Sequence, residues 1–155
     1  MSQIYLNSKS IARIAAIQAI YQFKNNKDIE SVLLRIIDFY KNRDVQSDYE
    51  IEKMPKLKIK PSFNYLKELV NYTYENINEI DVIIDNHLVK KWTLNSLSQL
   101  LLAILRVAIC EMKYFPEIPS KVIINEYTDI ASDMLDVGEI GFVNSVLDNY
   151  STNYR

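Results

Sequence analysis

The stretch LNSLSQLLLAILRVAICEMK, residues 94–113, decides the fold of this 155-residue chain. Its apolar residues recur three and four positions apart, which is the spacing of one face of an α-helix. The residues with this spacing are Leu94, Leu97, Leu101, Ile104, Leu105, Ala108 and Met112. The longest apolar run covers only residues 100–105 before Arg106 interrupts it, which is too short to cross a bilayer. The sequence therefore predicts a buried core helix.

Helical periodicity also predicts two helices near the N-terminus. Residues 11–24 are apolar on most sides and contain several alanines, so that neighbouring helices can approach this segment closely. Asp28 can cap a second helix with one apolar face, formed by Ile29, Val32, Leu33, Ile36, Ile37 and Tyr40. Residues 42–61 end in KMPKLKIKP, with two prolines and four lysines, and predict an exposed polar linker.

The remaining segments predict helices as well. Ser62 can cap a helix whose pattern continues after a break near Asn78. YFPEIP, residues 114–119, breaks the chain and ends in a proline that suits the first turn of the next helix. Asp136 and Glu139 have the spacing of a capping box for a last helix. Two glycines and four prolines are too few for turn-rich β or nucleotide-binding folds. We therefore expect an all-α fold of six to seven helices.

Few side chains offer catalytic or metal-binding chemistry. The single Cys110 excludes an internal disulfide, and its apolar surroundings predict a buried, inert thiol. His87 is the only histidine, so no second imidazole can share a metal with it, and we expect it on the surface. Phosphate-binding loops, nucleophile elbows and a signal-peptide cleavage site are absent from the sequence. We therefore expect no enzymatic activity, no metal and no cofactor.

Polar residues interrupt two apolar helices of the C-terminal half. IPSKVIINE, residues 118–126, carries an amide beside a carboxylate, and the preceding helix carries an arginine and a glutamate. Buried charges are tolerated when they are paired and hydrogen-bonded. An active site would need a pocket and a second convergent group, and the sequence indicates neither. We predict a structural polar clamp between these helices, formed by Arg106, Glu111, Asn125 and Glu126.

Charge is distributed unevenly along the chain, whose formal net charge is −2. Residues 1–27 contain four bases and no acid, whereas residues 126–155 contain six acids and one base. One stripe along the first helix is formed by residues spaced four apart, which are Lys9, Arg13, Ile17 and Tyr21. Such a stripe can hold a phosphate backbone and stack a base. Equally, its bases can be solvated while the tyrosine covers the core edge, and the residues alone leave both interpretations open.

Four segments, taken in order, resemble the signature blocks of the NusB family of bacterial transcription antitermination factors. They are ARIAAIQAIYQ (12–22), ILRVAICEM (104–112), IPSKVIINE (118–126) and FVNSVLD (142–148). The resemblance covers nearly the whole chain, and residues 42–61 are the least similar part. It implies two small helical bundles packed together in one domain over residues 1–155. The N-terminal helical half would cover about 1–78 and the C-terminal half about 79–155.

The resemblance also implies a function without enzymatic activity. NusB proteins pair with the small-subunit ribosomal protein NusE, and the heterodimer binds the boxA element of nascent ribosomal RNA transcripts. There it helps RNA polymerase, within an antitermination complex, to read through terminators. We therefore expect a cytoplasmic RNA-binding factor that does not enter a membrane. Some members form homodimers, and the sequence leaves monomer and homodimer open.

The family pattern can be carried over to individual positions of this chain. It implies an RNA surface that includes Lys9, Arg13, Tyr21, Lys121, Phe142 and Asn144. It implies a NusE surface around the start of the long central helix that includes Tyr21, Gln99, Leu101 and Leu102.

Three departures from the family pattern affect these expectations. NSKSIAR, residues 7–13, carries only two bases where many members are arginine-rich, and Gly141 stands where a base is common. Each lost phosphate contact lowers RNA affinity, so we expect weak RNA binding by the chain alone and greater dependence on its partner. The lysines at 53, 56, 58 and 60 are candidates to compensate. Leu101 replaces an acid of some members and predicts a more apolar NusE contact.

Three alternatives compete with this interpretation. The first is a helical protein–protein adaptor with little RNA affinity of its own, which the thinned basic segment favours. The second is the RNA-binding module of ribosomal RNA cytosine-5 methyltransferases, which would require a catalytic domain beyond Arg155. The third, a small helical enzyme, would require a pocket with several convergent titratable groups.

Overall fold

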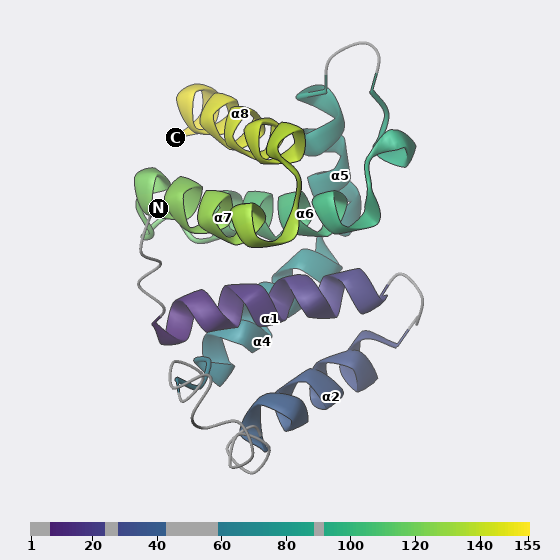
Figure 1. Ribbon diagram of the computed structural model, residues 1–155, viewed down its shortest axis with the longest axis vertical. Coiled ribbons are helices and arrows are strands. Elements are labelled where there is room, and N and C mark those ends of the chain that lie inside the picture. The colour runs from purple at the N-terminus through teal and green to yellow at the C-terminus, as the bar shows by residue number, and fades with distance from the viewer. Residues whose placement is uncertain (1–6, 24–27, 43–58, 89–91) are drawn as a thin grey trace.

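The computed structural model describes residues 7–23, 28–42, 59–88 and 92–155. These residues form seven α-helices and one short 3-10 helix, and they contain no strand (Figure 1). The elements are α1 (Ser8–Phe23), α2 (Ile29–Lys41), α4 (Phe63–Glu75), α5 (Ile77–Asn86), η2 (Leu94–Ser96), α6 (Gln99–Tyr114), α7 (Ser120–Met134) and α8 (Val137–Tyr154). The predicted all-α fold is confirmed.

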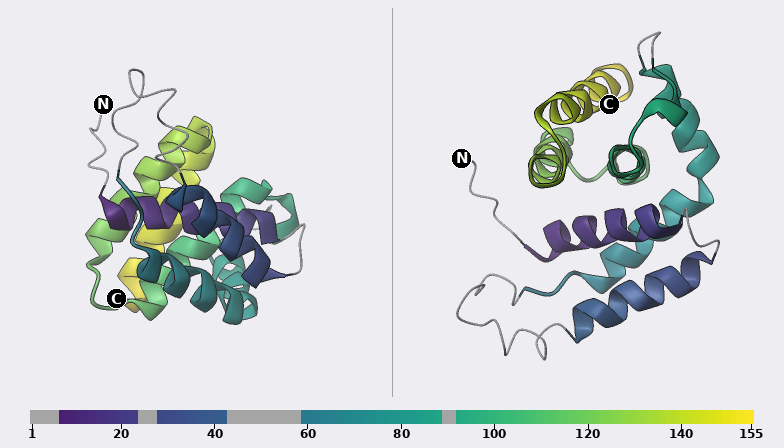
Figure 2. Two further views of the ribbon diagram at one scale, coloured as in Figure 1. Left: turned by 90° about the horizontal axis from the view of Figure 1, so that it is seen from below. Right: turned by 45° about the vertical axis from the view of Figure 1, so that its right-hand side comes forward.

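The helices form two packed groups around α6. Helices α1, α2 and α4 pack against one another, and α5, α7 and α8 pack against or beside α6. Helices α1 and α4 of the first group also contact α6, which joins the two groups (Figure 2). Among residues 101–112 of α6, Arg106 alone is not buried. The predicted buried core helix and the two packed bundles are therefore confirmed. The division of the chain between residues 78 and 79 stays a prediction.

Local capping interactions explain most helix boundaries. The side chains of Asp28 and Ser62 accept hydrogen bonds from the backbone N–H three residues later, so both predicted caps are confirmed. Asp136 and Glu139 form the predicted capping box of α8. The core helix begins at Gln99 rather than at residue 94, because the hydroxyl of Ser98 accepts from the backbone N–H of its first turn, at Leu101.

Smaller differences concern turns and loops. The predicted break near Asn78 lies at Asn76, between α4 and α5, and Pro119 is the residue immediately before α7. Residues 43–58, most of the predicted linker, lie outside the described residues. No helix in the described part of the chain is long and apolar enough to span a membrane.

Candidate nucleic-acid and partner interface

A buried arginine lies where α1 meets α6 and α7. Alanines of α1 that are fully buried, Ala12, Ala15, Ala16 and Ala19, bring its backbone close to its neighbours. Arg13, in the same buried face, donates from Nε to Glu111 Oε1 at 2.9 Å and from Nη2 to Glu111 Oε2 at 2.7 Å. Its Nη1 donates to Glu126 Oε1 at 2.8 Å. One guanidinium therefore joins α1 to α6 and to α7.

Hydroxyl groups complete the hydrogen bonding of the two carboxylates. Tyr65 Oη donates to Glu111 Oε2 at 2.8 Å, and Tyr127 Oη donates to Glu111 Oε1 at 2.7 Å. Ser10 Oγ donates to Glu126 Oε1 at 2.7 Å. We call Ser10, Arg13, Tyr65, Glu111, Glu126 and Tyr127 the buried network. Both oxygens of the Glu111 carboxylate accept hydrogen bonds, which makes the burial of its charge tolerable, because this carboxylate is 0% exposed.

Burial and charge shift the pKa values within this network. Burial raises the pKa of the Tyr127 hydroxyl well above its ordinary value of 10.0, and the negative charge of Glu111 raises it further. The same two causes, in the same order, raise the pKa of Tyr65. Burial alone would lower the pKa of Arg13, but the hydrogen bonds and charge of Glu111, with further electrostatic contributions, raise it overall. The guanidinium is therefore charged at every relevant pH.

The structure corrects the sequence-based placement of three residues. Arg13 was expected on the RNA surface, but its side chain is 2% exposed and all its guanidinium nitrogens donate to carboxylates. Arg106 was expected in the clamp, but it pairs bidentately with Asp81 of α5 at 2.8 Å instead. Asn125, which was also expected in the clamp, is exposed on α7. Glu111 and Glu126 do meet, through the arginine of α1.

The network was missed because its arginine looked like a phosphate-binding residue. Arg13 follows Lys9 at helical spacing, so the two bases seemed to share a solvent-facing stripe. The usable signal was the surrounding sequence, since ARIAAIQAI, residues 12–20, leaves an arginine inside an otherwise apolar and alanine-rich helix. A charge in that setting is expected to find buried partners.

Exposed cations gather instead where α1 and α4 begin and α2 ends. Lys9 is exposed, and its Nζ lies 5.0 Å from the centroid of the Tyr65 ring. Lys41 Nζ lies 5.7 Å from the centroid of the Phe63 ring. The backbone N–H of Ser62 donates to the carbonyl of Ser8 at 2.9 Å, which anchors the segment carrying Lys60 beside the start of α1. We call Lys9, Lys41 and Lys60, which are all exposed, the basic edge.

Other predicted RNA-contacting residues lie at different places on the surface. Tyr21, in the last turn of α1, is 42% exposed. It lies twelve residues from Lys9, which corresponds to about 18 Å along a helix. Lys121 and Asn144 are exposed on α7 and α8, and Phe142 is half-buried. These residues and the basic edge therefore do not form one compact patch but are spread over several helices.

The predicted NusE surface is partly accessible. Gln99 is exposed at the start of α6, and Tyr21 is available at the end of α1. Leu101 and Leu102 are each only 4% exposed, because both belong to the core that surrounds α6. Leu102 therefore offers almost no surface to a partner, contrary to the prediction. Leu101 differs because it borders an open pocket.

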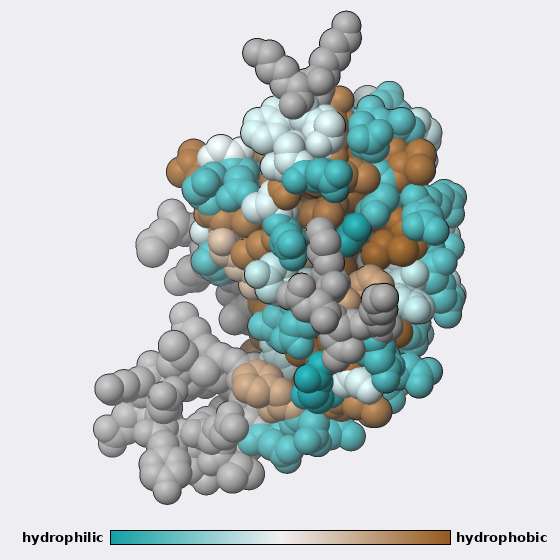
Figure 3. All heavy atoms as spheres, turned by 90° about the vertical axis from the view of Figure 1, so that its right-hand side faces the viewer, coloured by the Kyte–Doolittle hydropathy of each residue, from teal (hydrophilic) through white to brown (hydrophobic). Residues whose placement is uncertain are grey.

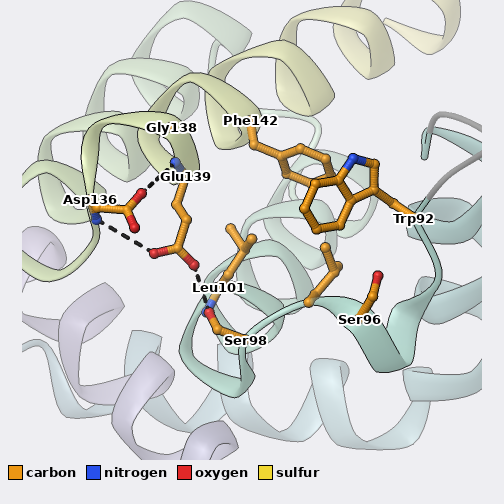
Figure 4. A pocket seen from close by; sticks show the side chains of 9 residues that line it. Trp92, Ser96, Ser98, Leu101, Asp136, Gly138, Glu139 and Phe142 are labelled. Carbon is orange, nitrogen blue, oxygen red and sulfur yellow. Dashed lines mark hydrogen bonds between the residues drawn. The ribbon is translucent and has the colours of Figure 1, made fainter.

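This pocket has a volume of about 450 Å³ and opens between the segment before α6 and the start of α8. Figure 4 shows Trp92 and Phe142 side by side, with Leu101 pointing towards them. The two aromatic rings are 6.4 Å apart between centroids. Leu97 also lines the pocket, and Ser98 and Glu139 lie on its rim. The pocket thus brings a predicted NusE residue and a predicted RNA residue to one site.

The described residues contain no arrangement that resembles a metal or nucleophile site. No group of three or more potential metal ligands occurs among them. Burial raises the pKa of the Cys110 thiol to about 12, and the charge of nearby Glu111 also raises it, so the thiol stays protonated. The ring of His87, which is partly buried rather than fully on the surface, bonds through Nδ1 to the carbonyl of Ile83 at 2.8 Å.

Comparison with known proteins shows that nearly the whole chain is similar to NusB proteins. The model of the NusB family matches residues 10–152. The transcription antitermination protein NusB of Rickettsia bellii is 51% identical over 96% of this chain and 92% of its own. That of Rickettsia massiliae is 48% identical over 99% of this chain and 97% of its own.

Solved structures agree with these sequence relationships. The T. maritima NusB structure has a TM-score of 0.73 and 26% identity, and covers 96% of this chain and 94% of its own. A structure of the antitermination factors NusB and NusE with dsRNA shares the fold, with a TM-score of 0.73, 21% identity, and coverage of 95% and 98%. The expectation of a non-enzymatic protein is confirmed by the relatives, which are antitermination proteins. The chain belongs to the NusB family.

Proposed function

We propose that this chain is an RNA-binding transcription antitermination factor. With NusE, it binds boxA of nascent ribosomal RNA transcripts and promotes read-through by RNA polymerase within an antitermination complex in the cytoplasm. One observation carries the proposal: proteins named for transcription antitermination are about half identical to this chain over almost its entire length. The crystal structure of NusB and NusE with dsRNA supports the choice of partner and ligand, because that NusB shares this fold.

The RNA surface that we propose is centred on the basic edge rather than on Arg13. Lys9, Lys41 and Lys60 are exposed, and they place positive charge at one end of the N-terminal group of helices. Phosphate groups need accessible cations, so exposed Lys9 and Lys41 are better contacts than a buried arginine whose nitrogens bind carboxylates. Tyr21 and Phe142 would contact bases at other places on the surface, with Lys121 and Asn144 as additional polar contacts.

The adaptor alternative gains support from one observation. Burial of Arg13 leaves Lys9 as the only accessible base of the segment NSKSIAR, residues 7–13. Fewer phosphate contacts mean lower RNA affinity and a flatter salt dependence. We therefore expect the chain alone to bind boxA RNA weakly and to depend on NusE for tight binding.

The test is a fluorescence anisotropy titration of boxA RNA with this chain, with and without NusE, over a series of salt concentrations. We expect NusE to tighten binding, and each substitution Lys9→Ala or Lys41→Ala to flatten the slope of log K against log[salt] by about 0.7. Arg35→Ala is the matched control, because Arg35 is an exposed cation of the same helix, α2, six residues or about 9 Å along the helix axis from Lys41. Its salt slope should equal that of the unmodified chain.

Two results would decide against parts of this proposal. Absence of RNA binding even with NusE, while NusE itself binds, would favour the protein adaptor. RNA binding that responds equally to Lys9→Ala and Arg35→Ala would mean that the basic edge is not the contact surface. In that case residues elsewhere, such as Tyr21 and Phe142, would have to make the main RNA contacts.

A further inference from the structure

Two aromatic rings in the first turn of α4 lie against lysines that come from other helices. Lys9 of α1 has its Nζ 5.0 Å from the centroid of the Tyr65 ring. Lys41 of α2 has its Nζ 5.7 Å from the centroid of the Phe63 ring. Both distances lie within the range of about 6 Å in which a ring face attracts a cation. The lysines are exposed, whereas Tyr65 is 8% exposed and Phe63 is half-buried. The start of α4 therefore supports both cations.

The ring of Tyr65 is held in place by several contacts. Its hydroxyl donates to Glu111 Oε2 at 2.8 Å, and its centroid lies 5.3 Å from that of the Phe115 ring. Its backbone N–H donates to the hydroxyl of Ser62, the residue that caps α4. A ring fixed by packing and hydrogen bonds keeps one orientation, so it offers Lys9 one preferred position.

The same ring also lies next to the buried arginine. Arg13 Cζ is 5.7 Å from the Tyr65 centroid, and Arg13 follows Lys9 by four residues. Like charges at this spacing on a helix repel each other. The electron-rich ring offsets part of this repulsion. Among the described residues, Lys9 takes part in no ion pair, so its charge is available to an anion.

We propose that Tyr65 is a positioning residue that holds Lys9 for contact with the phosphate groups of boxA RNA. Phe63 does the same for Lys41. The proposal rests on the proposed function and adds a role for two rings that do not bind phosphate themselves. A free lysine side chain has many rotamers, and restricting them before binding lowers the entropy cost of each phosphate contact.

Fluorination of the rings tests this role with little change in packing. Pentafluorophenylalanine is nearly as small as phenylalanine, but its ring face no longer attracts a cation. Tyr65→pentafluorophenylalanine is compared with Tyr65→Phe, because both variants lose the hydrogen bond to Glu111 and differ only in the ring. Phe63→pentafluorophenylalanine is compared with the unmodified chain. Fluorescence anisotropy with NusE present should show that each fluorinated ring lowers the affinity for boxA RNA by about two- to fivefold.

Salt dependence and a second substitution distinguish positioning from direct contact. Lys9→Ala removes a phosphate contact and flattens the salt slope, whereas the fluorinated rings keep the number of contacts and should leave the slope unchanged. In the Lys9→Ala background, the ring at position 65 has no lysine to position. Fluorination at position 65 should therefore cause no further loss of RNA affinity in that background.

A lysine elsewhere in the chain provides a matched control. Lys113 Nζ lies 5.5 Å from the centroid of the Tyr114 ring, but it already pairs with Glu79. Because this charge is neutralised by a carboxylate, Tyr114→Leu should leave the RNA affinity unchanged. The control thus separates a ring that supports an available cation from a ring that supports a paired one.

Binding of NusE serves as a control for the fold of each variant. Helix α1 ends and α6 begins on the right-hand side of Figure 1, where we expect NusE to bind. This face mixes apolar and hydrophilic residues (Figure 3), as is common for surfaces that bind protein. Helices α1 and α4 begin on the left-hand side of Figure 1. Fluorination should therefore leave the affinity for NusE unchanged. A parallel loss of both affinities would mean that the rings act through the whole fold, which would overturn the proposal.

The position of Lys9 can be observed directly by NMR. The face of an aromatic ring shifts nearby protons upfield, so the methylene protons beside the Lys9 ammonium should resonate upfield of those of a solvated lysine. Tyr65→Phe should retain this shift, and Tyr65→Leu should remove it. An ordinary shift in the unmodified chain would show that the ring does not hold Lys9, and would overturn the proposal.

The RNA titrations give the remaining outcomes. Equal RNA affinities of Tyr65→Phe and Tyr65→pentafluorophenylalanine would overturn the role of Tyr65 while leaving the proposed function intact. A loss on fluorination that persists in the Lys9→Ala background would mean that the ring contacts RNA itself, and would also overturn it. Absence of boxA binding by the unmodified chain with NusE would overturn both the proposed function and this proposal.

Discussion

Two arginines of this chain make the same local contact at very different depths. Arg13 and Arg106 each hold one carboxylate with two nitrogens, from Glu111 and Asp81 respectively. The side chains of the first pair are 2% and 0% exposed, whereas those of the second are 13% and 21% exposed. Removing one member of a buried pair strands a charge without water, but water can reach the survivor of the outer pair. Depth, rather than hydrogen-bond geometry, should therefore decide what each pair contributes.

The pairs also join different parts of the molecule. Arg13 connects α1 of the N-terminal group to α6 and α7 of the C-terminal group. Arg106 connects α6 to α5, which already pack together as neighbours. The inner arginine therefore helps to fix how the two groups of helices meet, and with it the spacing between the basic edge and the residues of α8 that we propose to contact RNA.

The largest effect is expected from Arg13→Ala. Loss of the guanidinium leaves the buried carboxylate of Glu111 without its cation, so the free energy of unfolding should fall by about 3–5 kcal/mol. Urea denaturation measures this loss. Arg35→Ala, at an exposed position, should change the same quantity by less than about 0.5 kcal/mol. If Arg13→Ala lost as little stability as Arg35→Ala, burial of the Arg13–Glu111 pair would not make that pair more important than the outer Arg106–Asp81 pair.

The second-largest effect is expected from alkaline pH, which should lower the free energy of unfolding through the two tyrosines of the buried network. Because burial and Glu111 raise the pKa values of Tyr65 and Tyr127, both hydroxyls stay protonated in the folded chain above the ordinary value of 10.0. The unfolded chain releases these protons first, so this stability is fully present below pH 10 and is lost as the pH rises further. Each unit of pKa difference corresponds to about 1.4 kcal/mol.

Urea denaturation between pH 8 and pH 11 checks this pH dependence. The Tyr65→Phe variant should be less stable at pH 8, because Glu111 loses one donor, but its stability should fall less steeply above pH 10. Parallel curves for the two proteins would show that Tyr65 does not contribute to the alkaline loss.

Glu126→Ala should have an intermediate effect. Its carboxylate accepts from Arg13 and Ser10 but is 16% exposed, so water can replace part of what is lost. We expect thermal melting and urea denaturation to show a loss of about 1–3 kcal/mol. RNA affinity, measured well below the melting temperature, should be unchanged. Unaltered stability combined with selective loss of RNA or NusE binding would make Glu126 a binding residue instead.

The smallest effect is expected from Arg106→Ala, about 1 kcal/mol or less, since the freed Asp81 is solvated. A double-mutant cycle with Asp81→Ala measures the coupling within this pair. The same cycle for Arg13 and Glu126 should give a larger coupling energy. Equal couplings would show that the bidentate geometry outweighs the difference in depth.

Much of the fold could be predicted from sequence because its determinants are local. Asp28, Ser62 and Asp136 cap helices through backbone groups three residues away, and their spacing is visible in the sequence. The apolar pattern of residues 94–113 likewise showed that α6 is buried, although Ser98 moved its start to Gln99. The candidate site was less predictable. Arg13, Arg106 and Asn125 were each assigned to the wrong environment, because helical spacing does not state which face meets which neighbour.

The helices and their caps could be predicted from the sequence, because periodicity and capping act within a few residues of the chain, and the resemblance of four segments to NusB signature blocks indicated the family. Which polar groups meet depends instead on tertiary packing. Arg13 finds its carboxylates 98 and 113 residues away, and the pocket joins Trp92 to the start of α8. Such contacts depend on how whole helices pack, and the free energy of burying a charge depends on all the groups that surround it. That is why an arginine that looked like an RNA contact instead holds the two groups of helices together.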